Sequence, residues 1–167
     1  VAEVRGDWAI AWTDISTGAL HAMPLAQPRI GAELARLAPS EVLMTDAAAE
    51  ALRPVTDDLG IWPTILGRAS FDSQSATTRL TDLYGVKSLE PFGDFSREEL
   101  SALGALVDYL DITQKGKLPL LRPPRSDSVS RLLQIDAATR RNLELTHGLS
   151  GGRAGSLLSV IDRTVTA

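Results

Sequence analysis

The sequence contains no cysteine in its 167 residues. That absence excludes disulfide bonds, thiolate nucleophiles and cysteine-based zinc sites together. Long apolar runs are missing too, since no stretch approaches the roughly 20 residues that a membrane-spanning helix requires. An initiator methionine is also absent, and nothing after Val1 resembles the basic and apolar regions of a secretion signal. We therefore expect a soluble, folded piece of a longer protein, cytoplasmic and without a membrane partner.

Positive charge is scarce as well, with 17 Lys and Arg against 21 Asp and Glu and a formal net charge of −4. A protein that binds nucleic acid by itself usually carries a basic stripe that neutralises phosphates. The nearest candidates are two isolated pairs, Arg122 with Arg125 and Arg140 with Arg141, and such pairs are typical of solvated surface. A weak nucleic-acid-binding module built on them remains an alternative function.

Hydrophobic residues make up 44% of the chain, which is enough for one well-buried domain and a short second element. The first 25 residues predict three strands in an antiparallel meander, at 1–4, 8–13 and 19–25. The sequence Asp-Ile-Ser-Thr-Gly at 14–18 supplies side-chain oxygens and a glycine that suit a tight turn. Trp8 and Trp12 alternate with alanines, which favours core packing over the stacking of bases.

Helices then alternate with short apolar runs. Apolar residues at helical spacing from Ile30 indicate a helix that ends before Pro39. Asp46 is expected to cap a second helix, which Pro54 closes. Pro63 suggests that the strand around it lies at a sheet edge. The elements expected here are a helix over 30–37, a strand over 42–44, a helix over 47–52 and a strand over 61–66.

Two longer helices follow. Residues 72–84 place apolar side chains on one face and polar ones on the other, and Gly85 ends the segment. Ser96 and Glu99 have the spacing of a capping box at the start of the next helix, which closes at Lys115 and Gly116.

The composition changes after this helix. Three prolines, two arginines and several serines between 118 and 130 predict an extended link between two bodies. Two final helices are expected, one capped by Asp136 that runs to about Thr146 and one over 154–162.

The end of the chain carries the most specific pattern. Residues 135–145 are Ile-Asp-Ala-Ala-Thr-Arg-Arg-Asn-Leu-Glu-Leu, and residues 156–166 are Ser-Leu-Leu-Ser-Val-Ile-Asp-Arg-Thr-Val-Thr. Together they closely resemble the opening of the core domain in the MutS family. The turn at 14–18 resembles the connector turn of that family, and Asp-Tyr-Leu-Asp-Ile-Thr-Gln at 108–114 is similar to the helix that ends the connector. The match follows the whole chain in order.

The resemblance implies an α/β fold of the ribonuclease-H-like kind. In that fold a three-stranded antiparallel meander is followed by alternating helices and strands. Residues 1–117 would form the connector domain and 118–130 a linker. Residues 131–167 would form a short all-α segment, the truncated start of the helical core.

The resemblance also implies a piece of a DNA mismatch-recognition ATPase. The whole protein would bind mismatched DNA as a dimer, use ATP and Mg²⁺, and recruit MutL. This sequence has neither the Phe-x-Glu motif that inserts at a mispair nor the Gly-x-x-x-x-Gly-Lys-Ser/Thr phosphate loop. We therefore expect that it holds no catalytic, cofactor or metal site. Its role would be to link the neighbouring domains of the same chain and to offer MutL a docking surface.

Such a surface requires exposed polar groups on a rigid element. In the helix expected over 72–84, Thr78, Arg79 and Asp82 lie on the face that cannot enter the core, and they are the candidates for contacting MutL. The plainer interpretation is that this face is only solvated surface, because most exposed helix faces bind nothing.

A ribonuclease-H-like outline also suggests a nuclease, in which several carboxylates hold two metal ions about 4 Å apart. Asp14 is the first candidate ligand, but it lies in a turn where aspartate commonly bonds the backbone. Glu3 on the first strand has no evident second and third carboxylate. His21 and His147 lack metal-ligand spacing, and no serine has a neighbouring base. A divergent metal-dependent nuclease therefore stays an alternative.

Overall fold

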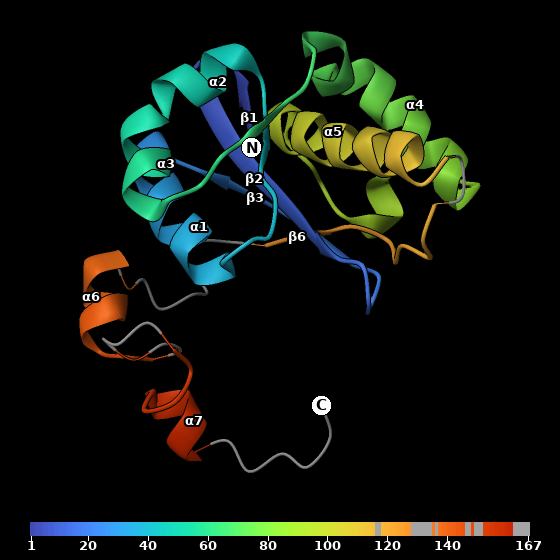
Figure 1. Cartoon of the computed structure of the whole chain (residues 1–167). Helices are drawn as coiled ribbons and strands as arrows, with labels where there is room; N and C mark the ends of the chain where they lie inside the picture. Colours follow the sequence, from blue (N-terminus) through green and yellow to red (C-terminus); the bar gives the residue numbers. More distant parts are fainter. Residues whose placement is uncertain (116–117, 128–134, 136, 146–147, 149–151, 162–167) are drawn as a thin grey trace.

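The computed structural model of the chain describes residues 1–115, 118–127, 135, 137–145, 148 and 152–161. Within these residues the structure is mixed α/β, as the sequence predicts (Figure 1). The strands are β1 (Ala2–Val4), β2 (Asp7–Asp14), β3 (Ala19–Leu25), β4 (Leu43–Met44), β5 (Thr64–Ile65) and β6 (Arg125–Ser126). The helices are α1 (Ile30–Leu37), α2 (Asp46–Ala51), α3 (Arg53–Leu59), α4 (Ser73–Tyr84), α5 (Arg97–Thr113), α6 (Ala137–Asn142) and α7 (Leu157–Ile161). In that same part of the chain, no helix is both long and apolar enough to cross a membrane.

The predicted antiparallel meander is confirmed. β1 pairs with β2 up to Val4 opposite Asp7, and the two residues between them, Arg5 and Gly6, both have positive φ. A two-residue loop with positive φ matches the right-handed twist of the strands that it joins. β2 then pairs with β3 along nearly its whole length, beginning at the turn with Asp14 opposite Ala19.

A second sheet of two strands lies beside the first. β4 and β5 are parallel, with Leu43 opposite Thr64. The Val1 amine donates a hydrogen bond of 2.9 Å to the carbonyl oxygen of Leu43, so β4 lies next to the start of β1. β5 spans only two residues, so it is shorter than the strand predicted over 61–66.

Two boundaries around α2 differ from the prediction. Pro54 does not close α2 but stands in the first turn of α3, where the N–H that proline lacks has no helical partner. The cap of α2 is Thr45, whose side chain accepts a hydrogen bond from the amide of Ala48, so Asp46 is the first helical residue. α1, by contrast, has the predicted bounds and is followed by the left-handed Ala38, one residue before Pro39.

Helices cover both faces of the four-stranded sheet. One face packs against α1 and α2 in a cluster that includes Trp8, Ile10, Met23, Ile30, Leu34 and Ala48. The other face packs against α4 and α5 in a cluster that includes Leu20, Ala22, Leu80, Leu103 and Val107. Ala2 of β1 and Ala9 of β2 contact Ala102 of α5. Because these side chains are small, α5 can lie close to the sheet.

The capping box predicted for α5 is confirmed. The Ser96 hydroxyl accepts a hydrogen bond from the amide of Glu99, and the Glu99 carboxylate accepts one from the amide of Ser96. The same buried carboxylate accepts a second hydrogen bond, of 2.6 Å, from the hydroxyl of Ser126 in β6. The helix ends at Thr113, and Gly116 lies outside the described residues.

The described part of the predicted link, residues 118–127, is extended and lies along the sheet. β6 pairs in parallel with β3, with His21 opposite Arg125. Leu121 and Pro124 are buried. This stretch therefore packs against the sheet.

Gly18 brings this stretch close to the turn between β2 and β3. Its φ is 69°, and a Cβ atom at this position would stand 2.1 Å from the carbonyl oxygen of Leu120. The amide of Arg122 donates a hydrogen bond of 2.8 Å to the Gly18 carbonyl oxygen. A side chain at residue 18 would push the extended stretch away from the sheet.

We expect Gly18→Ala to lower the free energy of unfolding more than Gly60→Ala does. Gly60 is a matched control, because its φ is 65° and a Cβ there would have nothing within 4 Å. Both variants lose about 1 kcal/mol to the left-handed backbone, and Gly18→Ala should lose about 1 to 3 kcal/mol more to the clash. Hydrogen exchange at the Arg122 amide should quicken only in Gly18→Ala. Equal losses with unchanged exchange would show that the contact with Leu120 is unimportant.

The two final helices are shorter than predicted in their described parts. α6 contacts α1 (Figure 1), and the amide of Leu157 at the start of α7 donates to the carbonyl oxygen of Glu144. Asp136, Thr146 and Asp162, which bear on the predicted ends of these helices, lie outside the described residues. The division of the chain at 117 and 131 stays a prediction.

Candidate functional site

The predicted docking residues lie on α4, but the structure gives them different surroundings. Thr78 and Asp82 are exposed, whereas Arg79 is half-buried between α4 and α5. The Arg79 guanidinium donates a hydrogen bond of 3.1 Å to the carbonyl oxygen of Gly104 and pairs at 2.9 Å with the carboxylate of Asp108. Arg79 therefore fastens the two helices together, and the polar groups offered to solvent are those of Thr78 and Asp82.

The carboxylates considered for a nuclease are held by turns. Asp14 accepts hydrogen bonds from the hydroxyl of Ser16 at 2.6 Å and from its amide at 2.9 Å, and these bonds lower the pKa of the Asp14 carboxyl. Glu3 accepts from the amide of Gly6 in the first hairpin. Among the described residues there is no group of three or more His, Asp or Glu side chains that could hold a metal ion.

The tryptophans divide into core and surface. Trp8 is buried, as predicted, and Trp12 is half-buried, with its ring stacked on His21 at 5.2 Å and the Arg36 guanidinium 5.5 Å away. Nδ1 of His21 lies 3.0 Å from the carboxylate of Asp127, which ties β3 to the segment after β6. Trp62, by contrast, is 90% exposed. His147 lies outside the described residues.

The arginine pairs are only partly described. Arg122 and Arg125 are exposed and line one hollow of about 420 Å³ together with His21 and Phe92. Arg140 and Arg141 lie in α6, and the described part of the structure does not include their side chains.

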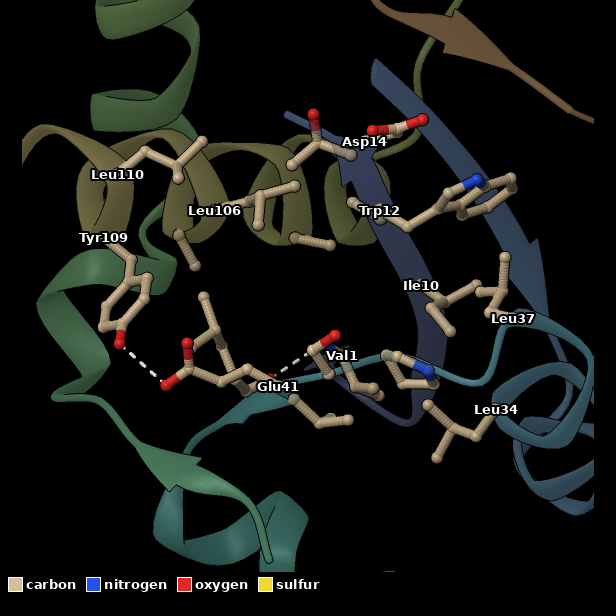
Figure 2. Close-up of a pocket in the computed structure, with 18 of the residues that line it drawn as sticks. Val1, Ile10, Trp12, Asp14, Leu34, Leu37, Glu41, Leu106, Tyr109 and Leu110 are labelled. Atoms are coloured by element: carbon tan, nitrogen blue, oxygen red, sulfur yellow. Dashed lines mark hydrogen bonds between the residues drawn. The ribbon is translucent and has the colours of Figure 1, made fainter. Parts of the chain in front are cut away.

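A pocket of about 490 Å³ lies at the free end of β1 (Figure 2). Its walls come from β2, from α1 and the residues after it, and from α5. The labelled side chains that line it are Val1, Ile10, Trp12, Asp14, Leu34, Leu37, Glu41, Leu106, Tyr109 and Leu110. No motif in the sequence predicted this pocket, because its walls come from segments that are far apart in the chain.

At one rim of the pocket, polar side chains are joined by hydrogen bonds. The Tyr109 hydroxyl donates a hydrogen bond of 2.7 Å to the Glu41 carboxylate, and that bond raises the pKa of Tyr109. Glu41 also accepts from the Thr64 hydroxyl at 2.7 Å, so the carboxylate is shared between α5 and β5. Burial lowers the pKa of the Val1 amine from 8.0 to about 5. The rest of the lining is mostly apolar, which suits an apolar occupant better than a reacting substrate.

Comparison with known proteins gives a consistent result. A family model described as MutS domain II matches residues 1–122. The chain is also similar to the DNA mismatch repair protein MutS of Roseobacter denitrificans (61% identical over 166 residues), Ruegeria pomeroyi (65% over 166) and Paracoccus denitrificans (54% over 166). Each alignment covers 99% of this chain and 19% of the relative, so the chain spans about a fifth of the length of the curated relatives that it matches.

Proposed function

This chain belongs to the MutS family, in which it corresponds to domain II, and from this we propose that it is the rigid connector of a DNA mismatch repair protein. The observation that carries the proposal is the position of α5. That helix contacts β1, β2, β3 and α4, and its inner face is buried along most of its length. An element packed against so many others transmits a displacement from one end of the domain to the other, because close-packed interiors deform little.

The ribonuclease-H-like fold is part of the same proposal. It is supported by the strand order β1-β2-β3-β6, with the antiparallel meander at its start and a parallel strand at its far edge. The bond from Val1 to Leu43 adds the parallel pair β4-β5 on the other side of β1. Helices on both faces complete the outline.

We further propose that the chemistry belongs to the whole protein and not to this chain. By resemblance the whole protein binds mismatched DNA as a dimer in the cytoplasm, uses ATP and Mg²⁺, and recruits MutL. Residues 1–117 would be the connector, 118–130 the linker and 131–167 the start of the helical core. The engagement of Asp14 and Glu3 in turns supports a chain without a metal site of its own.

For docking of MutL, we propose the exposed face of α4 around Thr78 and Asp82, with Arg79 behind it. Arg79 holds the face in place through α5 and contributes little free charge, since Asp108 neutralises it. The side chains of Thr78 and Asp82 are short, so little side-chain conformational entropy would be lost when a partner binds them.

We expect Asp82→Arg combined with Thr78→Arg to weaken binding of purified MutL at least tenfold, which corresponds to about 1.4 kcal/mol. The measurement is a binding titration with the whole mismatch repair protein that contains this chain, with DNA and ATP present. Asp57→Arg on α3 is the matched control, because Asp57 is also an exposed helical aspartate. MutL affinity that is the same in both variants would exclude the α4 face as the docking surface.

A further inference from the structure

The sequence Arg-Pro-Pro-Arg at 122–125 places two arginines on one side of an extended chain. Each proline fixes its own φ at about −65° and favours an extended conformation in the residue before it. Because such a chain turns once in about three residues, the first and fourth side chains lie on the same side. In the structure, Arg122 and Arg125 line the same hollow of about 420 Å³, whereas Pro124 between them is buried.

The backbone of both arginines is fixed by contacts with distant parts of the chain. The Arg122 amide donates a hydrogen bond of 2.8 Å to the Gly18 carbonyl oxygen, and the Arg122 carbonyl oxygen accepts one of 2.9 Å from the Tyr84 hydroxyl. Burial raises the pKa of Tyr84 to about 12, so this hydroxyl stays protonated and uncharged at neutral pH. Arg125 lies in β6, opposite His21 of β3. A ligand would therefore meet two arginines whose backbone is already ordered, which lowers the entropy cost of binding.

The two guanidinium groups have no acidic partner in the described part of the chain. The ion pairs found there involve other cations. The described residues that line the hollow include no Asp or Glu. Asp127, two residues after Arg125, has its carboxylate 3.0 Å from Nδ1 of His21. Two cations that share one hollow repel each other, so an anion bound between them would be stabilised by both.

A phosphate monoester matches these two groups better than a carboxylate does. Guanidinium groups bind both kinds of anion through paired N–H donors. A carboxylate carries a single negative charge, whereas a phosphate monoester carries about −1.5 to −2 at neutral pH and has three strong acceptor oxygens. One phosphate group can therefore neutralise both arginines at once.

The other walls of the hollow indicate a ligand larger than a bare phosphate. They include the apolar side chains of Leu20, Pro91, Phe92 and Pro123. Phe92 is held by an edge-to-face contact with Tyr84, in which the ring centroids are 5.4 Å apart. A volume of about 420 Å³ lies in the range of sites for small organic ligands. A planar or apolar group attached to the phosphate would contact these walls.

We propose that this hollow binds a small organic phosphate of the nucleoside monophosphate class. Its phosphate would lie between Arg122 and Arg125, and its base would lie against Pro91 and Phe92. The site is separate from the ATP use proposed for the whole protein, because this chain has no phosphate loop. A bound ligand would connect residues 118–127 with the segment around Phe92, and it would hold the extended stretch on the sheet.

The test is a titration of the chain with adenosine monophosphate, followed by NMR of the backbone amides. We expect saturable shifts at the residues that line the hollow and slower hydrogen exchange at the Arg122 amide. Arg122→Gln combined with Arg125→Gln should weaken binding at least tenfold. Arg29→Gln combined with Arg68→Gln is the matched control, because both arginines are exposed and lie outside the hollow. The control removes the same charge and should bind as the unchanged chain does.

Three further ligands define the chemical class. Adenosine, which has no phosphate, should give no saturable shifts, and inorganic phosphate should bind at least tenfold more weakly than adenosine monophosphate, because it cannot stack. Equal affinity for inorganic phosphate would overturn the proposal, since the hollow would then be a site for a bare oxyanion. Tighter binding of a short acidic peptide would overturn it in favour of a docking surface for a protein.

Two results with adenosine monophosphate itself would also overturn the proposal. One is the absence of saturable shifts in the unchanged chain. The other is an equal loss of affinity in the two double variants, because general electrostatic attraction would then account for the binding. A well-dispersed amide spectrum in each variant shows that a lost affinity does not come from unfolding.

Discussion

Gly104→Ala should lower the melting temperature of the chain by roughly 5 to 10 °C, as a loss of about 2 to 3 kcal/mol predicts for a domain of this size. A Cβ at residue 104 would stand 2.3 Å from the Cβ of Ala76 and 2.9 Å from its Cα. α4 and α5 would have to separate, since neither atom belongs to a flexible side chain. The clash outweighs the gain of about 1 kcal/mol that alanine brings over glycine inside a helix.

Two companion variants make this measurement specific. Gly67→Ala places a methyl group where nothing lies within 4 Å and should change stability by less than about 0.5 kcal/mol. Adding Ala76→Gly to Gly104→Ala removes the facing methyl group, so the double variant should recover part of the loss. Thermal melting that is unchanged in Gly104→Ala would mean that the two helices are not in the close contact described.

Lowering the pH from 8 to 5 should destabilise the chain with a free Val1 amine by up to about 4 kcal/mol, as an order of magnitude. Burial moves the pKa of this amine from 8.0 to about 5 in the folded state. Between these values the unfolded chain binds a proton that the folded chain excludes. Stability is therefore greatest above pH 8 and decreases until the folded amine also titrates near pH 5.

The control for this effect is acetylation of the Val1 amine. The acetyl group removes the titration, keeps an N–H that can donate to the Leu43 carbonyl oxygen, and extends into the pocket (Figure 2). Urea unfolding at several pH values should show a clearly smaller slope between pH 5 and 8 in the acetylated chain. The same slope in both chains would show that other groups cause the pH dependence.

The sequence predicted those structural features that depend on a few neighbouring residues. The two hairpin turns, the capping box of Ser96 and Glu99, and the end of α4 at Gly85 all depend on contacts within about four residues. Pro54 shows where such reasoning stops. A proline can follow the end of one helix or stand in the first turn of the next, so the local sequence does not distinguish the two, and in the structure Pro54 stands in the first turn of α3.

The candidate site was less predictable for the same reason. Periodicity placed Thr78 and Asp82 on the polar face of α4, and both are exposed. It also placed Arg79 there, without indicating that Gly104 and Asp108 of α5 would engage its guanidinium. The pocket beside Val1 had no signal at all, because residues of β2, α1 and α5 form it only after folding.

The family of this chain, its mixed α/β class and its antiparallel meander followed from the sequence alone, because composition, residue order and short-range geometry are properties of the chain itself. The close contact of Gly104 with Ala76, the packing of residues 118–127 against the sheet and the pairing of Arg79 with Asp108 were decided only by the tertiary structure. Each of them depends on the distance between backbones that lie far apart in sequence, and that distance is fixed only when the whole core packs.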